Sequence, residues 1–173
     1  MTISLYDATV SSFRQTLGAL SGLLAKAEAF CAEKGVAPEQ LIQARLAEDM
    51  LPFAYQIKSS VVHSVGAIEG VRRGSFSPDR TTPPETFPAL HVRITDALKT
   101  LEAMDRSEID ACVGHDMCFV AGERRIEYTA ENFLLSFSLP NFYFHAATAY
   151  DILRWQGLQI GKRDFMGKTR ARR

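Results

Sequence analysis

The stretch YDATVSSFRQTLGALSGLLAKAEAFC, residues 6–31, decides the fold. Its apolar and small side chains recur at alternating intervals of four and three residues. They are Tyr6, Val10, Phe13, Leu17, Leu20, Leu24, Ala27 and Cys31. Such a stripe stays on one face of a helix and is typical of helices that pack lengthwise on other helices. Ser4 with Asp7 predicts the N-terminal cap of this helix, and Gly35 predicts its end.

Two more segments carry a stripe of this kind. Pro38 is expected to open a short helix, and a longer one is expected to start near Asp49 as N-cap, with Pro52 in its first turn. The stripe of that helix runs through Met50, Ala54, Ile57, Val61, Val65 and Ile68. A third helix is predicted to begin at Thr82 or Thr86, with the stripe Phe87, Leu90, Ile94, Leu98, Leu101 and Met104.

The connections differ in character. The loop GVRRGSFSPDRTTPPE, between the second and third helices, is rich in Gly, Ser and Pro and is long enough for a crossover. In residues 107–128 the helical period fades. MCFV and the alternating RRIEYT predict two strands, joined by a turn at Ala121-Gly122. A small hairpin is therefore expected before the last helix.

The last helix is predicted to start near Thr129 and to end at Gly157. Pro140 lies within it and is expected to kink it. Its stripe is Leu134, Phe137, Asn141, His145, Thr148, Ile152 and Trp155. The fold class predicted from these patterns is all-α: a four-helix bundle over residues 1–160 with a small β-hairpin between helices three and four. Residues 161–173 form a basic C-terminal tail that is expected to be loose.

Composition limits the partners. Lys and Arg number 20 and Asp and Glu also number 20, which argues against nucleic acid as the main partner. A net charge of zero and the many aromatic residues around the last helix favour self-association, and a homodimer is expected. Three cysteines are no disulfide framework, and neither a signal peptide nor an apolar run long enough for a membrane is found. A cytoplasmic protein without a membrane partner is expected.

Asn141 and His145 are the polar pair of interest. Their spacing of four places an amide and an imidazole on the apolar side of the last helix. One interpretation is an internal polar pocket that faces the start of the second helix, near Asp49, Tyr55 or Gln56. The other is that both side chains satisfy local hydrogen bonds, including a carbonyl freed by Pro140.

Other candidates are weaker. His63 lies about 20 Å along the helix from Asp49, so the two cannot share an ion, and His63 is interpreted as a half-buried surface histidine. CVGHDMC, residues 112–118, spaces two cysteines and a histidine evenly, but structural zinc needs four ligands. Cys31 lies on an apolar stripe and is interpreted as a small core residue.

Three segments carry a resemblance to a known family: DMLPFAYQI (49–57), LPNFYFHAATAYDILRWQG (139–157) and IGKRDFMG (160–167). They resemble the DUF1993 proteins, which belong with the DinB/YfiT-like metalloenzymes, a superfamily of four-helix bundles. In many of these, one histidine on the second helix and an H-x-x-x-H pair on the fourth bind a divalent metal. The resemblance implies that His145 is the last ligand and that Asn141 replaces the other.

The start of the second helix offers Asp49 and Gln56 instead of a histidine. At most a weak divalent-metal site, His145 with Asp49, is expected, and no tightly bound zinc. The sequence thus predicts a DinB-like bundle whose pocket binds a small molecule. Two alternatives stay open: a divalent-metal-dependent enzyme, with thiol transfer or hydrolysis implied by the resemblance, and a non-enzymatic dimeric bundle that acts through its surface.

Overall fold

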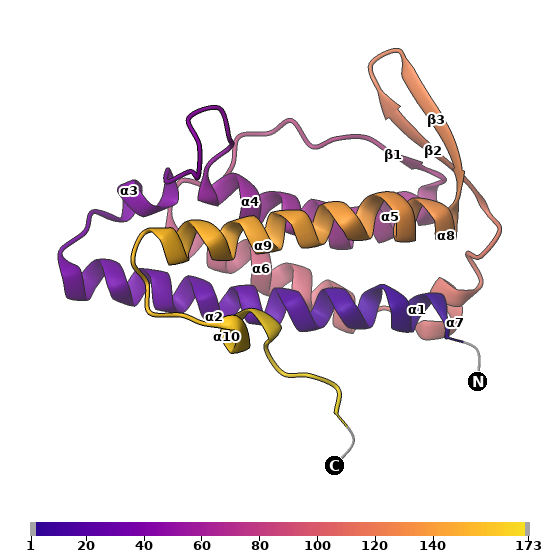
Figure 1. Cartoon of the computed structure of the whole chain (residues 1–173). Helices are drawn as coiled ribbons and strands as arrows, with labels where there is room; N and C mark the ends of the chain where they lie inside the picture. The colour runs from indigo at the N-terminus through magenta and orange to yellow at the C-terminus, as the bar shows by residue number, and fades with distance from the viewer. Residues whose placement is uncertain (1–2, 172–173) are drawn as a thin grey trace.

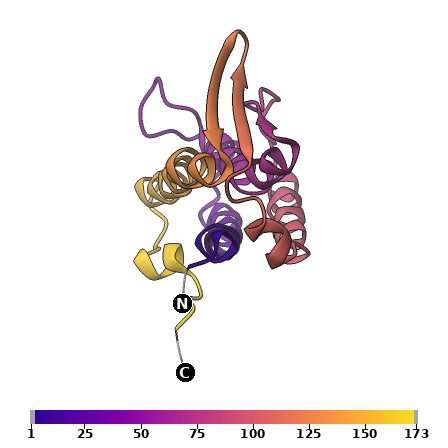
Figure 2. The same cartoon turned by 90° about the vertical axis from the view of Figure 1, so that its right-hand side faces the viewer.

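Four long helical segments pack side by side, with a small sheet at one end, in the computed structural model, which describes residues 3–171 (Figures 1 and 2). α2 (Val10–Lys34) packs against α6 (Phe87–Glu102) and α9 (Leu139–Trp155). α4 (Phe53–Val61) packs against the same two helices. The predicted helical bundle is confirmed, while a three-stranded sheet makes the molecule mostly helical instead of all-α.

The first stripe forms as the sequence predicts. The hydroxyl of Ser4 accepts a hydrogen bond of 3.1 Å from the backbone N–H of Asp7 and caps α1 (Leu5–Ala8). At Thr9 the chain deviates from the helix before α2 begins, and Gly35 ends α2 with a φ of 65°, a conformation that favours glycine. Most of the stripe is fully buried, namely Val10, Phe13, Leu17, Leu20, Leu24 and Ala27.

The start of the second long helix differs from the prediction. Pro38 does open a short helix, α3 (Pro38–Ile42), but α4 begins only at Phe53, with Pro52 as its N-cap residue. The expectation that Asp49 caps this helix is wrong, because Asp49 lies in an exposed turn. The physical reason is Pro52, whose ring disfavours a helical conformation at the residue before it.

α4 does not continue as a regular helix. It passes through a π-helical turn, η1 (Val62–Gly66), into α5 (Ala67–Arg73). Two buried hydroxyls accompany the change: Ser60 donates to the carbonyl of Gln56 at 2.9 Å, and Ser64 donates to that of Ser60 at 2.8 Å. Hydroxyls that return to the preceding turn in this way bend helices.

The connection after α5 is a crossover. Residues 77–86 run back along the length of the bundle, so that α6 runs in the same direction as α4 (Figure 1). Thr86 caps α6, since its hydroxyl accepts from the N–H of Ala89 at 3.3 Å. Of the two predicted starts of this helix, Thr86 is therefore the correct one. A short helix, α7 (Arg106–Asp110), follows α6 and leads to the sheet.

The predicted hairpin is confirmed, and a third, short strand pairs with it. β2 (Asp116–Ala121) and β3 (Arg124–Thr129) pair antiparallel, and the turn lies at Gly122-Glu123, one residue later than predicted. Gly122 has a φ of 63°, which suits the first position of a tight hairpin turn. β1 (Ser75–Phe76) pairs parallel with β2. A strand of two residues is too short to show a period in the sequence.

The last helix begins where predicted but changes its phase. Thr129 caps α8 (Ala130–Asn132), which passes through a second π-helical turn, η2 (Phe133–Ser138), into α9. Pro140 lies in the first turn of α9, directly after the π-helical geometry has ended the regular ladder. The interior face of α9 consists of Phe142, Ala146, Thr148, Ala149, Ile152 and Leu153. The prediction that Trp155 faces inward is wrong, since this side chain is 66% exposed.

The segment expected to be a loose tail lies along α2 instead. α10 (Lys162–Met166) is held there by an ion pair of 2.5 Å between Asp164 and Lys26. The side-chain amide of Gln15 adds a hydrogen bond of 2.9 Å to the carbonyl of Met166. Residues 172–173 of the tail lie outside the described residues. Within 3–171, no helix has the length and apolar character needed to cross a membrane.

Candidate functional site

The centre of the site is a hydrogen bond between the second and fourth long helices. His145 of α9 is partly buried, and its Nδ1 lies 2.7 Å from Oε1 of Gln56 on α4. Gln56 is only 2% exposed. Gln56 is one of the three residues, with Asp49 and Tyr55, that the sequence predicts near His145.

Gln56 fixes the tautomer of His145. The Nε2 of Gln56 donates a hydrogen bond of 2.7 Å to the carbonyl of Leu51, so its Oε1 is the end that faces the imidazole. An amide oxygen only accepts, so Nδ1 of His145 must carry the proton. The other ring nitrogen, Nε2, is then left with a lone pair, which makes it an acceptor or a base.

A second histidine lies over the first. His63, from the π-helical turn η1, stacks on His145 with ring centroids 5.7 Å apart and an angle of 15° between the planes. It also contacts the rings of Phe76 and Phe137, each at 5.7 Å. Nδ1 of His63 is buried and has no hydrogen-bond partner among residues 3–171. The partial burial of His63 agrees with its interpretation as a half-buried surface histidine, but its stacking on His145 is not predicted from the sequence.

Both imidazoles are neutral at pH 7. Burial lowers the pKa of His63 to about 4, and the neighbouring His145 adds to the shift. Burial also lowers the pKa of His145 to about 4. Removing a group from water disfavours its charged form, so a partly buried imidazole loses its proton more readily. Neutral imidazoles offer lone pairs, which a charged pair would not.

The two π-helical turns hold the pair in place. The buried hydroxyl of Ser138, at the end of η2, donates a hydrogen bond of 2.8 Å to the carbonyl of His63 in η1. This bond joins residues 75 positions apart in the chain. π-helical turns in α-helices often occur at functional sites. Here each turn lies beside the stacked rings, so the irregular backbone and the histidine pair form one unit.

The other predicted pocket residues have different places. Tyr55 packs edge-on against His145, with centroids 5.9 Å apart. Asn141 donates from its side-chain amide to the carbonyl of Phe137 at 2.7 Å, which is the local hydrogen bond considered as the alternative to a pocket role. Asp49 lies in the exposed turn before α4 and makes no hydrogen bond to His145.

A buried lysine beside Tyr55 went unnoticed in the sequence. Lys58 is 1% exposed, and its Nζ forms an ion pair of 3.1 Å with Asp79 and bonds to the carbonyls of Asp79 and Thr81. Arg93 pairs with the same carboxylate at 3.1 Å. Burial acts to raise the pKa of Asp79, but hydrogen bonds from Thr81 and Lys58 lower it to about 2. The crossover is thus tied to α4; the only hint in the sequence is a lysine amid apolar residues.

The donor set does not match a tightly held metal. Two imidazoles meet at the centre, but the oxygen of Gln56 is turned to Nδ1–H of His145, and an amide is a weak ligand for transition metals. Among residues 3–171, no three His, Cys, Asp or Glu side chains gather in a way that could hold an ion. Zinc sites in proteins use three or four such ligands. Cys31, Cys112 and Cys118 are free, buried thiols outside the pair.

A helical bundle with a crossover between its second and third long segments agrees with the DinB-like fold that the sequence motifs predict. Comparison with solved structures agrees. The chain is similar to a DinB family member protein from Shewanella denitrificans, with a TM-score of 0.81 and 27% sequence identity. The similarity covers 98% of this chain and 95% of that one. A search of curated proteins found no match.

The family follows from the sequence itself. The model of the domain of unknown function DUF1993 matches residues 5–166, which is nearly the whole described chain. The chain belongs to the DUF1993 family, and the resemblance seen in its three motifs is confirmed.

Proposed function

We propose that this protein binds a small organic molecule at the stacked imidazoles of His63 and His145. The observation that carries the proposal is the state of the ring nitrogens. Gln56 holds the proton of His145 on Nδ1, which leaves a lone pair on Nε2, and Nδ1 of His63 is buried without a partner in the described chain. Buried polar atoms are nearly always paired, so an orphaned one favours a partner from outside the described chain, and a donor on a bound molecule would supply it.

The surroundings limit the chemistry of the ligand. Tyr55, Phe76, Phe137 and Phe144 surround the two rings, with centroids between 5.3 and 5.9 Å from one of them. Neutral imidazoles do not attract an anion, and an aromatic wall favours an apolar body. The ligand class that fits is an uncharged molecule with a hydroxyl, amide or thiol donor that reaches a ring nitrogen.

The test follows the imidazole nitrogens of the two histidines by NMR while small alcohols, amides and thiols with an apolar body are added. We expect Nε2 of His145 to shift with saturation, and the variant Gln56→Leu to bind at least about tenfold more weakly, because its imidazole is free to change tautomer. Gln43→Leu is the matched control, since Gln43 is exposed. The proposal would be refuted if no compound shifted the nitrogen resonances of either imidazole, or if both variants lost the same amount of affinity.

A divalent-metal-dependent enzyme of the DinB/YfiT type, a thiol transferase or hydrolase, is the second candidate. The observation in its favour is the approach of a second imidazole, that of His63, to His145. Metal analysis of protein purified without a histidine tag separates the two functions. If the unaltered chain holds one metal ion per molecule, and His63→Phe and His145→Phe each lose it, the enzyme is favoured over our first proposal.

A third candidate is a dimeric bundle that acts through its surface. It is favoured by the outer side of α9, where Phe144 is 58% and Trp155 is 66% exposed. Large exposed apolar side chains on one helix are typical of an interface. A symmetric homodimer would cover them with the same face of a second copy.

A further inference from the structure

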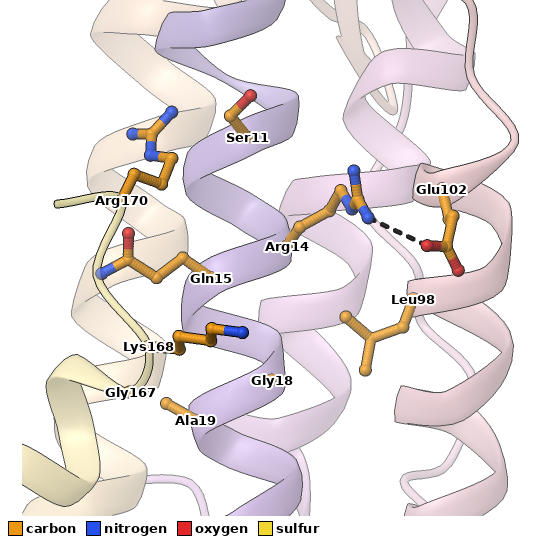
Figure 3. A pocket seen from close by; sticks show the side chains of 10 residues that line it. All are labelled: Ser11, Arg14, Gln15, Gly18, Ala19, Leu98, Glu102, Gly167, Lys168 and Arg170. Carbon is orange, nitrogen blue, oxygen red and sulfur yellow. Dashed lines mark hydrogen bonds and ion pairs between the residues drawn. The ribbon is translucent and has the colours of Figure 1, made fainter. Parts of the chain in front are cut away.

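A groove on the other side of the bundle is formed where the C-terminal segment crosses α2. Its walls are α2, α6 and the residues that follow α10, and its volume is about 570 Å³, which suits a small molecule (Figure 3). It shares no residue with the histidine centre. The segment that follows α10 forms one wall, so this segment has a structural role.

The C-terminal wall is seated closely on α2. Gly167 has a φ of 60° and a ψ of −147°, a conformation reserved in practice for glycine. A Cβ at this position would lie 3.1 Å from Cβ of Ala19, closer than most Cβ contacts in proteins, so a larger residue would push this segment away from α2. Beyond it, the guanidinium of Arg170 donates to the carbonyl of Asp7 and to the hydroxyl of Ser12, each at 3.3 Å.

The groove concentrates positive charge in a chain whose charges cancel. Three cations line it, Arg14, Lys168 and Arg170, against one carboxylate, that of Glu102. Arg14 is paired with Glu102 at 3.1 Å, as the dashed line in Figure 3 marks. Lys168 makes no ion pair or hydrogen bond with any residue from 3 to 171. The lining therefore carries two positive charges in excess, and one of its cations has no partner.

The hollow itself comes from a glycine on α2. Gly18 lies in the middle of the helix, and a Cβ built there would meet no atom within 4 Å. A glycine inside a helix is less stable than alanine by about 1 kcal/mol, so nothing in the packing of α2 explains its presence. The absent side chain leaves open the space that Lys168 and Arg14 flank (Figure 3).

We infer that this groove binds a small phosphorylated molecule with at least two negative charges. Arginine matches the oxygens of a phosphate with its planar fork, and lysine adds a compact point charge. The hydroxyl of Ser11 lines the same space and can donate to a further oxygen, while the amide of Gln15 is held by the carbonyl of Met166. The size of the groove favours a small molecule over a polymer.

The experiment is a calorimetric titration of the full chain with inorganic pyrophosphate at low salt. We expect saturable binding that Lys168→Ala weakens about tenfold, as the loss of a charge-assisted hydrogen bond implies. Lys162→Ala is the matched control, because Lys162 belongs to the same segment but does not line the groove. Equal weakening in both variants, or no saturable binding to the unaltered chain, would overturn the inference.

A second pair of variants tests the hollow without touching a charge. Gly18→Leu fills the groove and is expected to abolish binding, while the helix content stays unchanged in circular dichroism. Gly22→Leu adds the same side chain to α2 where a Cβ also meets no atom within 4 Å, outside the groove. It is expected to bind as the unaltered chain does. Undiminished binding of pyrophosphate by Gly18→Leu would overturn the inference. So would a single-stranded oligonucleotide that binds the unaltered chain more tightly than pyrophosphate does and that Gly18→Leu still binds.

Discussion

Acid is expected to destabilise the folded chain between about pH 6.5 and pH 4 through the stacked histidines. The pKa of His63 and that of His145 are lowered from 6.5 to about 4 in the folded state. In this range the unfolded chain binds more protons than the folded one, so the free energy of unfolding falls as the pH falls. The loss begins at the unfolded pKa and is complete below the folded one.

The magnitude follows from the shift. One pKa unit corresponds to about 1.4 kcal/mol, so the shift of each ring amounts to about 3 kcal/mol in full. About 2 kcal/mol per ring is expected to be lost on going from pH 7 to pH 5. The carboxylates with lowered pKa values, such as that of Asp79, contribute mainly at lower pH, because their unfolded pKa lies near 4.

Urea denaturation at pH 7 and pH 5 measures this loss. His63→Phe and His145→Phe are each expected to remove about half of the difference between the two pH values. His115→Phe is the control, because His115 is exposed and lies outside the pair. A free energy of unfolding that is the same at both pH values would refute the placement of the two rings, and so would an equal effect of the control.

Three other predictions concern packing and assembly. Ser138→Ala removes the hydrogen bond to the carbonyl of His63 and is expected to lower the free energy of unfolding in urea by about 0.5–1.5 kcal/mol; the exposed control Ser136→Ala is expected to lower it by less than about 0.5 kcal/mol. Lys58→Met removes a buried ammonium that pairs with the partly exposed Asp79 and is expected to lower the free energy of unfolding by about 1–3 kcal/mol in the same assay and to expose Asp79 and its loop to proteases; unchanged cleavage would contradict this. Light scattering is expected to give a dimer mass, and Trp155→Ser a monomer; a monomer before substitution would exclude the interface on α9.

The helices were predictable because their stripes repeat over many turns. The stripe of α2 is buried almost as written, and Ser4, Thr86 and Thr129 each cap a helix by the hydrogen bond that their residue type predicts. The errors come from local backbone geometry. A π-helical turn adds a residue to one helical turn, so a stripe extrapolated across η2 is out of phase in α9. This is why Trp155 is exposed.

Only part of the candidate site could be predicted from the sequence. The sequence predicts that His145 faces the start of the second helix, near Asp49, Tyr55 or Gln56, and the structure places Nδ1 of His145 2.7 Å from Oε1 of Gln56. The stacking of His63 on His145 is absent from the prediction, because the sequence places Asp49 at the start of the same helix and His63 too far from it, whereas Asp49 lies in the turn before α4. His63 follows Gln56 by seven residues, two helical turns, which places both on one side of the segment. Lys58 could not be predicted, because its acceptors lie on a loop without a periodic pattern.

The crossover between α5 and α6 divides the paired histidines between two halves of the chain. Gln56 and His63 precede the crossover, whereas His145 follows it, and Arg80 lies exposed between them. Cleavage at Arg80 would produce two polypeptides, each with two of the four long helical segments and one of the two imidazoles. Neither fragment holds the site alone, so the restored stack of the two rings would report the reunion of separately expressed halves. The fold thus contains a natural point for split-protein complementation.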